Sequence, residues 1–151
     1  MRISAKADYA VRAAVEMSAA GDEPLKGEKI AEAQDIPLQF LEHILLELKH
    51  ARLVRARRGA RGGYWLARPP DEITLASVIR AVEGPLANIQ DLAPEQTKYP
   101  GNAQRLSEVW VAVRSSLRRV LEHVTVADLR DGKIPADVLE LTKDEGAWVT
   151  R

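Results

Sequence analysis

The sequence predicts a mainly α-helical fold with one two-stranded hairpin and a long helix toward the carboxyl end. Apolar residues recur every three or four positions over residues 6–51 and 102–124, which is the period of a helix face. Between these regions a glycine-rich stretch, residues 58–62, separates two β-prone segments. Hydrophobic residues make up 46% of the 151 residues, so the chain can bury a core as one domain.

Three short helices are expected before the hairpin. Residues 6–20 form the first, which Gly21-Asp22-Glu23-Pro24 ends, and residues 27–34 form the second. Pro37 suits the first turn of a third helix, residues 37–51, because its missing N–H costs no helical hydrogen bond there. The stripe that packs this helix onto the first two consists of Leu41, Ile44, Leu45 and Leu48.

The hairpin and the helix after it have clear boundaries. Its strands are expected at residues 53–57 and 63–67, and Pro69-Pro70 stops the second strand. A fourth helix, residues 75–83, follows, with Thr74 as its N-cap. Gly84-Pro85 ends this helix.

The carboxyl-terminal half is expected to contain a loop and the longest helix. The helix, residues 102–124, has an apolar seam whose members step by threes and fours, and Thr125 opens a capping box for a short helix that ends at Gly132. The seam consists of Leu106, Trp110, Val113, Leu117, Val120 and Leu121. The expected organisation is a first unit at 1–85, a loop at 86–101, the long helix at 102–124, and a short helix with a tail at 125–151.

The charge is distributed unevenly along a chain whose net charge is zero. Residues 49–68 hold seven bases and no acid, so the other 131 residues hold 15 bases against 22 acids. Six of the seven bases are Arg, whose planar guanidinium suits phosphates and guanine edges. The seven are Lys49, Arg52, Arg55, Arg57, Arg58, Arg61 and Arg68.

This order of elements is that of a winged helix-turn-helix, in which the third helix enters the DNA major groove. Gln39, Glu42 and His43 lie together on its polar face, at spacings of three and four residues. Glycines let the hairpin turn sharply and approach the sugar–phosphate wall. Arg58 and Arg61 at the tip are expected to neutralise phosphates or to enter a narrow minor groove.

Several segments together resemble the IscR/NsrR/CymR-type bacterial transcription regulators, called the Rrf-two family. The resemblance is close over residues 1–85 and looser over the long helix. The segments that carry it are Met1–Val11, Lys29–Glu32, Phe40–Leu45, Ala51–Val54, Arg58–Tyr64, Ile73-Thr74 and Ala81–Pro85.

The resemblance implies a homodimer whose long helix crosses to the partner subunit, and two wings that grip a pseudo-palindromic operator. Its seam then becomes the dimer interface. By position, Gln39, Glu42 and His43 match base-contacting residues, and Ser4 and Lys6 match a phosphate-contacting segment. The positions that match phosphate or minor-groove contacts are Lys49, Arg58, Gly59, Arg61, Gly62, Gly63 and Tyr64.

The chain departs from the family pattern where some members bind an iron–sulfur cluster. Those members carry three cysteines in the loop that matches residues 88–107, whereas this chain has no cysteine at all, which excludes a cysteine-ligated cluster. Asp8, which matches a ligand in some members, has no thiolate partner. The turn carries Asp35 where the family commonly has glycine, and Asp tolerates the left-handed conformation that a turn requires.

Other interpretations of these residues are less favoured. The polar helix face alone is typical of solvated surface, and the spacing of His43, Glu47 and His50 could hold zinc but lacks the HExxH pattern. Trp65 is expected in the core beneath the hairpin, with a contact to DNA as the alternative. No nucleophile elbow or phosphate-binding loop occurs, so we expect neither an enzyme nor a cofactor or metal.

The sequence therefore predicts a cytoplasmic, dimeric, sequence-specific DNA-binding regulator that acts as a repressor. The alternative is a winged-helix module for protein–protein contact, which the carboxylate of Glu42 favours unless it accepts from a cytosine amino group. Three kinds of control stay open: a small molecule between residues 86–101 and the long helix, a protein partner, or no effector. No stretch approaches the length of a membrane-spanning helix.

Overall fold

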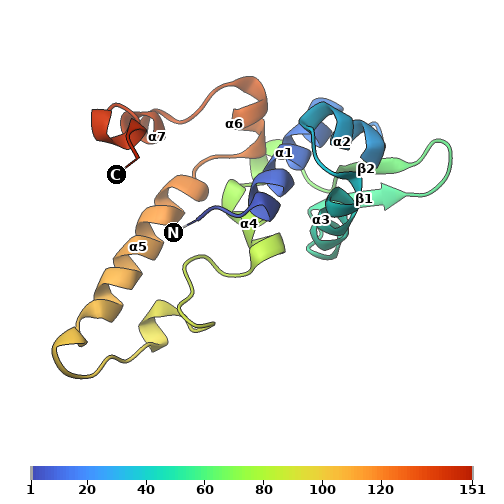
Figure 1. Ribbon diagram of the computed structural model, residues 1–151. Helices are drawn as coiled ribbons and strands as arrows, with labels where there is room; N and C mark the ends of the chain where they lie inside the picture. The colour runs from blue at the N-terminus through green and yellow to red at the C-terminus, as the bar shows by residue number, and fades with distance from the viewer. Residues whose placement is uncertain (1, 151) are drawn as a thin grey trace.

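The computed structural model describes residues 2–150 and is mainly helical, with one antiparallel hairpin (Figure 1). The hairpin lies at one end of the molecule, and the long helix α5 extends from the other end. The elements are α1 (Ala5–Ala19), α2 (Gly27–Gln34), α3 (Leu38–His50), β1 (Val54–Arg57), β2 (Gly63–Leu66), α4 (Leu75–Glu83), α5 (Leu106–Leu121), α6 (Val126–Asp131) and α7 (Ala136–Glu140). Short 3-10 turns are η1 (Pro70–Glu72), η2 (Pro94–Gln96), η3 (Gly101–Ala103) and η4 (Glu145–Trp148).

The core lies among α1, α2, α3, α4 and α6. α1 contributes a stripe of small residues, Ala10, Ala13 and Ala14, which lets neighbouring helices approach its backbone closely. The expected inward stripe of α3 is confirmed, because Leu41, Ile44, Leu45 and Leu48 are fully buried. Burying this stripe inward directs the opposite face of α3 to solvent.

The hairpin is joined to the body through its second strand. Leu25 and Tyr64 exchange two backbone hydrogen bonds, of 2.9 and 2.8 Å. Gly63 must be glycine here, since its φ is +148° and an added Cβ would lie 2.7 Å from the Leu25 carbonyl oxygen. Gly62 is equally constrained, because its Cβ would lie 2.0 Å from the Arg57 carbonyl oxygen.

Trp65 does not lie in the core beneath the hairpin, so that prediction was wrong. Trp65 is the direct cross-strand partner of Arg55, and such partners share a face of the sheet. Arg55 is exposed and Trp65 is half-buried, whereas Val54 on the alternate face is buried in the core. The strand period of two therefore turns Trp65 to the outer face.

Two helix ends use left-handed residues other than glycine. Asp35 ends α2 with φ 50° and ψ 52°, which confirms that this turn needs the conformation that Asp tolerates. After α3, Arg52 has φ 58°. The Leu53 N–H donates to the Leu48 carbonyl and the Arg52 N–H to the Lys49 carbonyl, each at 3.0 Å, so α3 ends in a Schellman motif with arginine at its usual glycine position.

The long helix α5 is shorter than the expected range of 102–124. Gly101 has φ 58° and opens a 3-10 turn, which delays the start of the helix to Leu106. At the other end, the Val124 carbonyl accepts from the Leu75 N–H and the Val126 N–H donates to the Ile73 carbonyl, both at 2.9 Å. This backbone pairing draws the chain out of the helix and ties its base to the start of α4.

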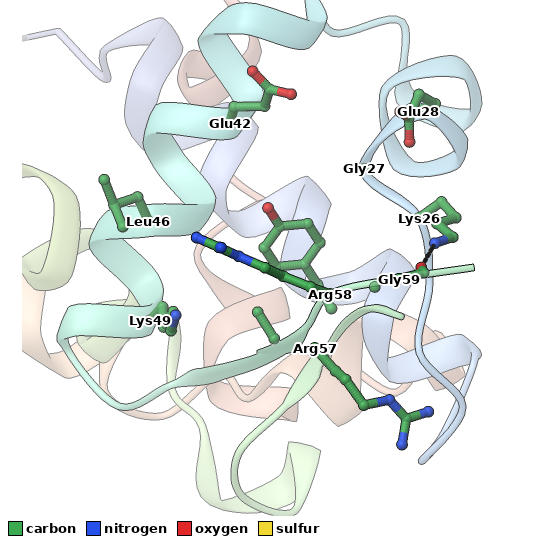
Figure 2. Close-up of a pocket in the computed structure, with 12 residues that line it drawn as sticks. Lys26, Gly27, Glu28, Glu42, Leu46, Lys49, Arg57, Arg58 and Gly59 are labelled. Carbon is green, nitrogen blue, oxygen red and sulfur yellow. Dashed lines mark hydrogen bonds between the residues drawn. The ribbon is translucent and has the colours of Figure 1, made fainter. Parts of the chain in front are cut away.

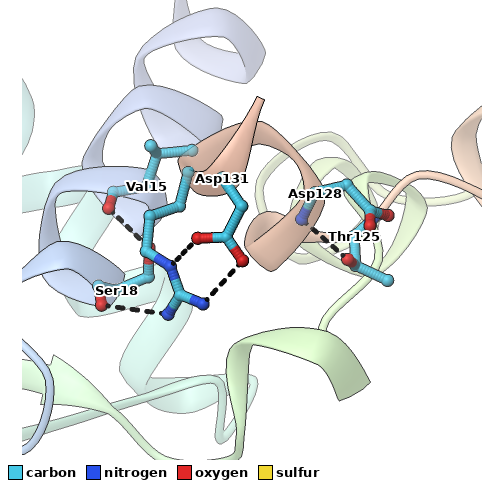
Figure 3. A network of polar contacts seen from close by, with 6 residues as sticks. Val15, Ser18, Thr125, Asp128 and Asp131 are labelled. Atoms are coloured by element: carbon cyan, nitrogen blue, oxygen red, sulfur yellow. Dashed lines mark hydrogen bonds and ion pairs between the residues drawn. The ribbon is translucent and has the colours of Figure 1, made fainter. Parts of the chain in front are cut away.

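Helix α6 packs against α1 (Figure 3). The expected capping box is confirmed, since the Asp128 N–H donates to the Thr125 hydroxyl and the Thr125 N–H to the Asp128 carboxylate. The helix ends at Gly132, as expected, and Gly132 adopts the left-handed conformation. Arg130 donates to the Ser18 carbonyl and pairs with Asp131, a contact that joins α6 to the end of α1. Over residues 2–150, no helix has the length and apolar character to cross a membrane.

Candidate nucleic-acid interface

A groove of about 400 Å³ separates α3 from the hairpin and the start of α2 (Figure 2). The α3 side contributes Glu42, Leu46 and Lys49. The hairpin side contributes Ala56, Arg57, Arg58, Gly59, Gly63 and Tyr64, and the start of α2 contributes Lys26, Gly27 and Glu28. Six of the predicted site residues thus line one groove: Glu42, Lys49, Arg58, Gly59, Gly63 and Tyr64.

Hydrogen bonds at the tip of the hairpin tie it to the start of α2 and close its turn. The Lys26 ammonium donates to the Gly59 carbonyl at 2.6 Å, which ties the tip to the start of α2. The Arg57 guanidinium donates to the Arg61 carbonyl at 2.9 Å and closes the tip. Figure 2 shows Arg58 directed toward α3 and Arg57 directed away from it, so the two neighbours serve different faces.

The bases of residues 49–68 lack ion-pair partners. Across the part of the chain that the structure describes, none of the seven forms an ion pair, although nine bases elsewhere do. Like charges held together without acids repel one another and attract a polyanion from solution. Lys49, Arg57 and Arg58 line the α3 groove with Lys26, against the two acids Glu28 and Glu42, so bases outnumber acids in its lining.

The polar face of α3 is exposed as expected. Gln39, Glu42 and His43 are all exposed, and the His43 Nδ1 lies 2.8 Å from the Gln39 carbonyl oxygen. Leu46 lies on the same face, one turn beyond Glu42, with 49% of its surface exposed. The sequence analysis considered only the polar side chains of this face and therefore missed Leu46. The sequence feature that could have identified Leu46 is its position outside the buried stripe of α3.

The remaining predicted contacts lie outside the groove. Ser4 caps α1 by accepting from the Ala7 N–H at 3.0 Å, and its hydroxyl donates to Glu83. Lys6 pairs with Glu47 at 2.8 Å. Among residues 2–150 no group of three metal-ligating side chains comes together. Arg61 is exposed at the hairpin tip and Gly62 is buried beside it.

The apolar seam of α5 is incompletely covered by its own chain. None of its residues is buried, and Leu106, Trp110, Val113, Leu117, Val120 and Leu121 are all half-buried. Val109 on the same helix is 52% exposed. Two ion pairs attach the helix to the body, Arg114 with Glu95 at 2.7 Å and Glu122 with Arg80.

Solved structures of known proteins share this architecture. The structure of CymR, the global cysteine regulator of Bacillus subtilis, superposes with a TM-score of 0.72 at 32% identity, covering 87% of this chain and 97% of that one. The IscR structure from T. potens gives 0.69 at 30% identity and covers 100% and 93%. The Rrf2 family model, described as an iron-dependent transcriptional regulator, matches residues 3–132.

The chain belongs to the Rrf2 family. An HTH-type transcriptional regulator of Mycobacterium tuberculosis, Rv1287, is 48% identical over 145 residues, which are 95% of this chain and 90% of the relative. CymR of B. subtilis is 34% identical over 130 residues, 85% of this chain and 89% of the relative. The protein is thus a DNA-binding transcriptional regulator and not an enzyme.

The iron in the Rrf2 family description does not fit the residues of this chain. The full sequence has no cysteine, so it offers no thiolate for a cluster. The carboxylate of Asp8, the position that matches a ligand in some members, pairs with Arg12 at 3.0 Å. A cysteine-ligated cluster therefore cannot control DNA binding by this Rrf2 protein.

Proposed function

We propose that the protein acts as a homodimeric repressor that binds a pseudo-palindromic operator. In each subunit α3 enters the major groove, where Gln39, Glu42 and His43 contact base edges. Leu46 adds an apolar contact of the kind that a thymine methyl group accepts. The contacts with phosphates or the minor groove come from Ser4, Lys6, Lys49 and residues 58–64. The protein acts in the cytoplasm, where bacterial DNA lies.

The observation that carries this proposal is that the seven bases of residues 49–68, of which Lys49, Arg57 and Arg58 line the α3 groove, form no ion pair among the described residues. A protein–protein module would bury such charges only against a matching acidic surface. A DNA duplex supplies a regular row of phosphates, and the glycine backbone of the wing lets the chain approach them.

Dimerisation is supported by the exposed apolar side of α5. Trp110, Val113 and Leu117 are half-buried although each would gain from full burial. A second copy of the same helix is the simplest cover, because a twofold axis matches a palindromic operator. The units at 1–85 and 102–124 then have separate tasks, DNA contact and assembly.

Control by a small molecule has one structural candidate. A hollow of about 400 Å³ lies between the amino-terminal segment, residues 83–88 and the α5 side chains Leu117 and Leu121. A ligand there would contact both the DNA-binding unit and the dimer helix. Control by a protein partner, or by no effector, stays an alternative.

The experiment is a fluorescence-polarisation titration on a duplex from the protein's own promoter region at 50 to 200 mM salt. With about six to eight phosphates contacted, affinity should fall on the order of a thousandfold over that range. Replacing Arg58 and Arg61 with Ala should abolish operator binding and leave the dimer intact. Salt-independent binding, or loss of a protein partner with unchanged DNA binding, would contradict the proposal.

A further inference from the structure

The outer face of the hairpin carries a second positive surface beside the α3 groove. A hollow of about 580 Å³ lies there, lined by Lys49, Arg52, Val54, Arg55, Ala56, Trp65, Ala67 and Arg68, with no acid among them. Lys49 and Ala56 also line the α3 groove, so the two surfaces are continuous. Arg52, Arg55 and Arg68, here named the outer arginine patch, are all exposed.

The backbone at Arg52 shows that folding alone does not favour this residue. Arg52 occupies the left-handed position of the Schellman motif after α3, with φ 58°. Glycine adopts that conformation without the steric penalty that an arginine Cβ meets. The side chain is exposed and forms no ion pair within residues 2–150. A strained residue whose side chain forms no ion pair or hydrogen bond to offset the strain is typical of a functional position.

Trp65 lines the same hollow as the outer arginine patch. It is half-buried and is the cross-strand partner of Arg55. The indole N–H has no hydrogen-bond partner among the described residues, so it can donate to a phosphate oxygen. Beyond Trp65 a second hollow is lined by Asp22, which limits the positive surface on that side.

We propose that the outer arginine patch binds the phosphate backbone of duplex DNA flanking the half-site held by α3. This inference rests on the proposed function and extends it, because a duplex seated in the α3 groove continues past Lys49 onto the hairpin's outer face. The three guanidiniums and the indole N–H contact phosphates and leave base identity to α3. The flanking contact therefore adds affinity for any sequence.

The test compares two duplexes. One is the operator core obtained by selection from a randomised library, and the other is that core extended by about ten base pairs of fixed sequence at each end, one helical turn. For the wild type, the slope of log affinity against log salt should be steeper on the extended duplex by about one per added phosphate contact. The triple variant Arg52→Ala, Arg55→Ala, Arg68→Ala should lose this gain and keep its affinity for the core.

The matched control removes three charges elsewhere, Lys98→Ala, Arg105→Ala and Lys143→Ala, and should keep the gain on the extended duplex. An outer-patch variant that keeps the gain, or loses affinity equally on both duplexes, would overturn the flanking site. A wild type that binds neither duplex with salt dependence would instead refute the proposed function.

A single variant separates binding from folding. Arg52→Gly should raise the melting temperature by a few degrees, because glycine relieves the strain at φ 58°. The same change should reduce the gain on the extended duplex, whereas Arg52→Lys should retain most of it. A lower melting temperature for Arg52→Gly would mean that the arginine serves the fold, and it would overturn the inference.

Discussion

The hairpin and α5 differ in how completely their own chain fixes them. The hairpin is pinned by the Leu25–Tyr64 backbone pair and by Lys26 at its tip, so its charged surface is formed in one subunit. Helix α5 is attached by the backbone pairing at its base and by two ion pairs, and none of its residues is buried. The proposed DNA-contacting surface is thus formed within one chain, while the apolar side of α5 is left partly exposed by its own chain.

The largest effect is expected from disrupting the apolar seam of α5. Trp110→Asp with Leu117→Asp should give a folded monomer whose operator affinity is lower by about a hundredfold or more, because two linked half-sites bind far more tightly than one. Sedimentation velocity and polarisation titration measure the two changes. Ser116→Asp, an exposed position on the same helix, is the control. A double variant that stays dimeric would contradict the assignment of the seam.

Loosening the hairpin comes next in size. Gly63→Ala places a Cβ against the Leu25 carbonyl and should weaken DNA binding about tenfold or more while the dimer persists. Gly132→Ala is the matched control, since Gly132 has φ +65° and open space around it. If both variants bind DNA alike, the Leu25–Tyr64 junction does not position the wing.

A smaller effect is expected at Leu46 on the exposed face of α3. Leu46→Ala should reduce affinity several-fold, in line with the loss of about 1 kcal/mol of apolar contact. Replacing operator thymines with uracil removes only the methyl groups and should weaken the wild type but not the variant. Equal sensitivity of both proteins to uracil would place Leu46 away from the bases.

The smallest effect is a dependence of α5 attachment on pH. A hydrogen bond from Arg80 lowers the pKa of Glu122, and hydrogen bonds from the backbone and Arg114 lower the pKa of Glu95. Because their pKa values are lowered, the ionised carboxylates stabilise the attachment of α5 at neutral pH. This stabilisation is lost as the pH falls through the lowered pKa values. Hydrogen exchange of α5 amides should accelerate on acidification. The double variant Glu95→Gln, Glu122→Gln should show no such change.

Much of the fold follows from local sequence signals. The inward stripe of α3, the Thr125 capping box and the left-handed Asp35 were all predicted, because each depends on residues close in sequence. The carboxyl-terminal end of α5 was not, since the pairing of Val124 and Val126 with the start of α4 joins segments that are far apart in the sequence. Long-range pairing has no local signature.

The candidate site was predicted in part. Charge counting located the basic segment, and it could not separate the residues that line the α3 groove from those on the outer face. That separation follows from strand register, which turned Trp65 and Arg55 outward. Leu46 was missed because apolar residues on a helix are expected in the core, and only the completed packing shows which remain exposed.

The backbone pairing at the base of α5 acts as a stiff joint. Ile73 and Leu75 hold Val126 and Val124, and the adjoining α4 packs directly on α1. A change in the tilt of α5 would therefore move the unit at residues 1–85 as a whole. In a twofold assembly this coupling would set the distance between the two copies of that unit. The spacing of the DNA half-sites would then depend on residues at the base of α5, which contact no base.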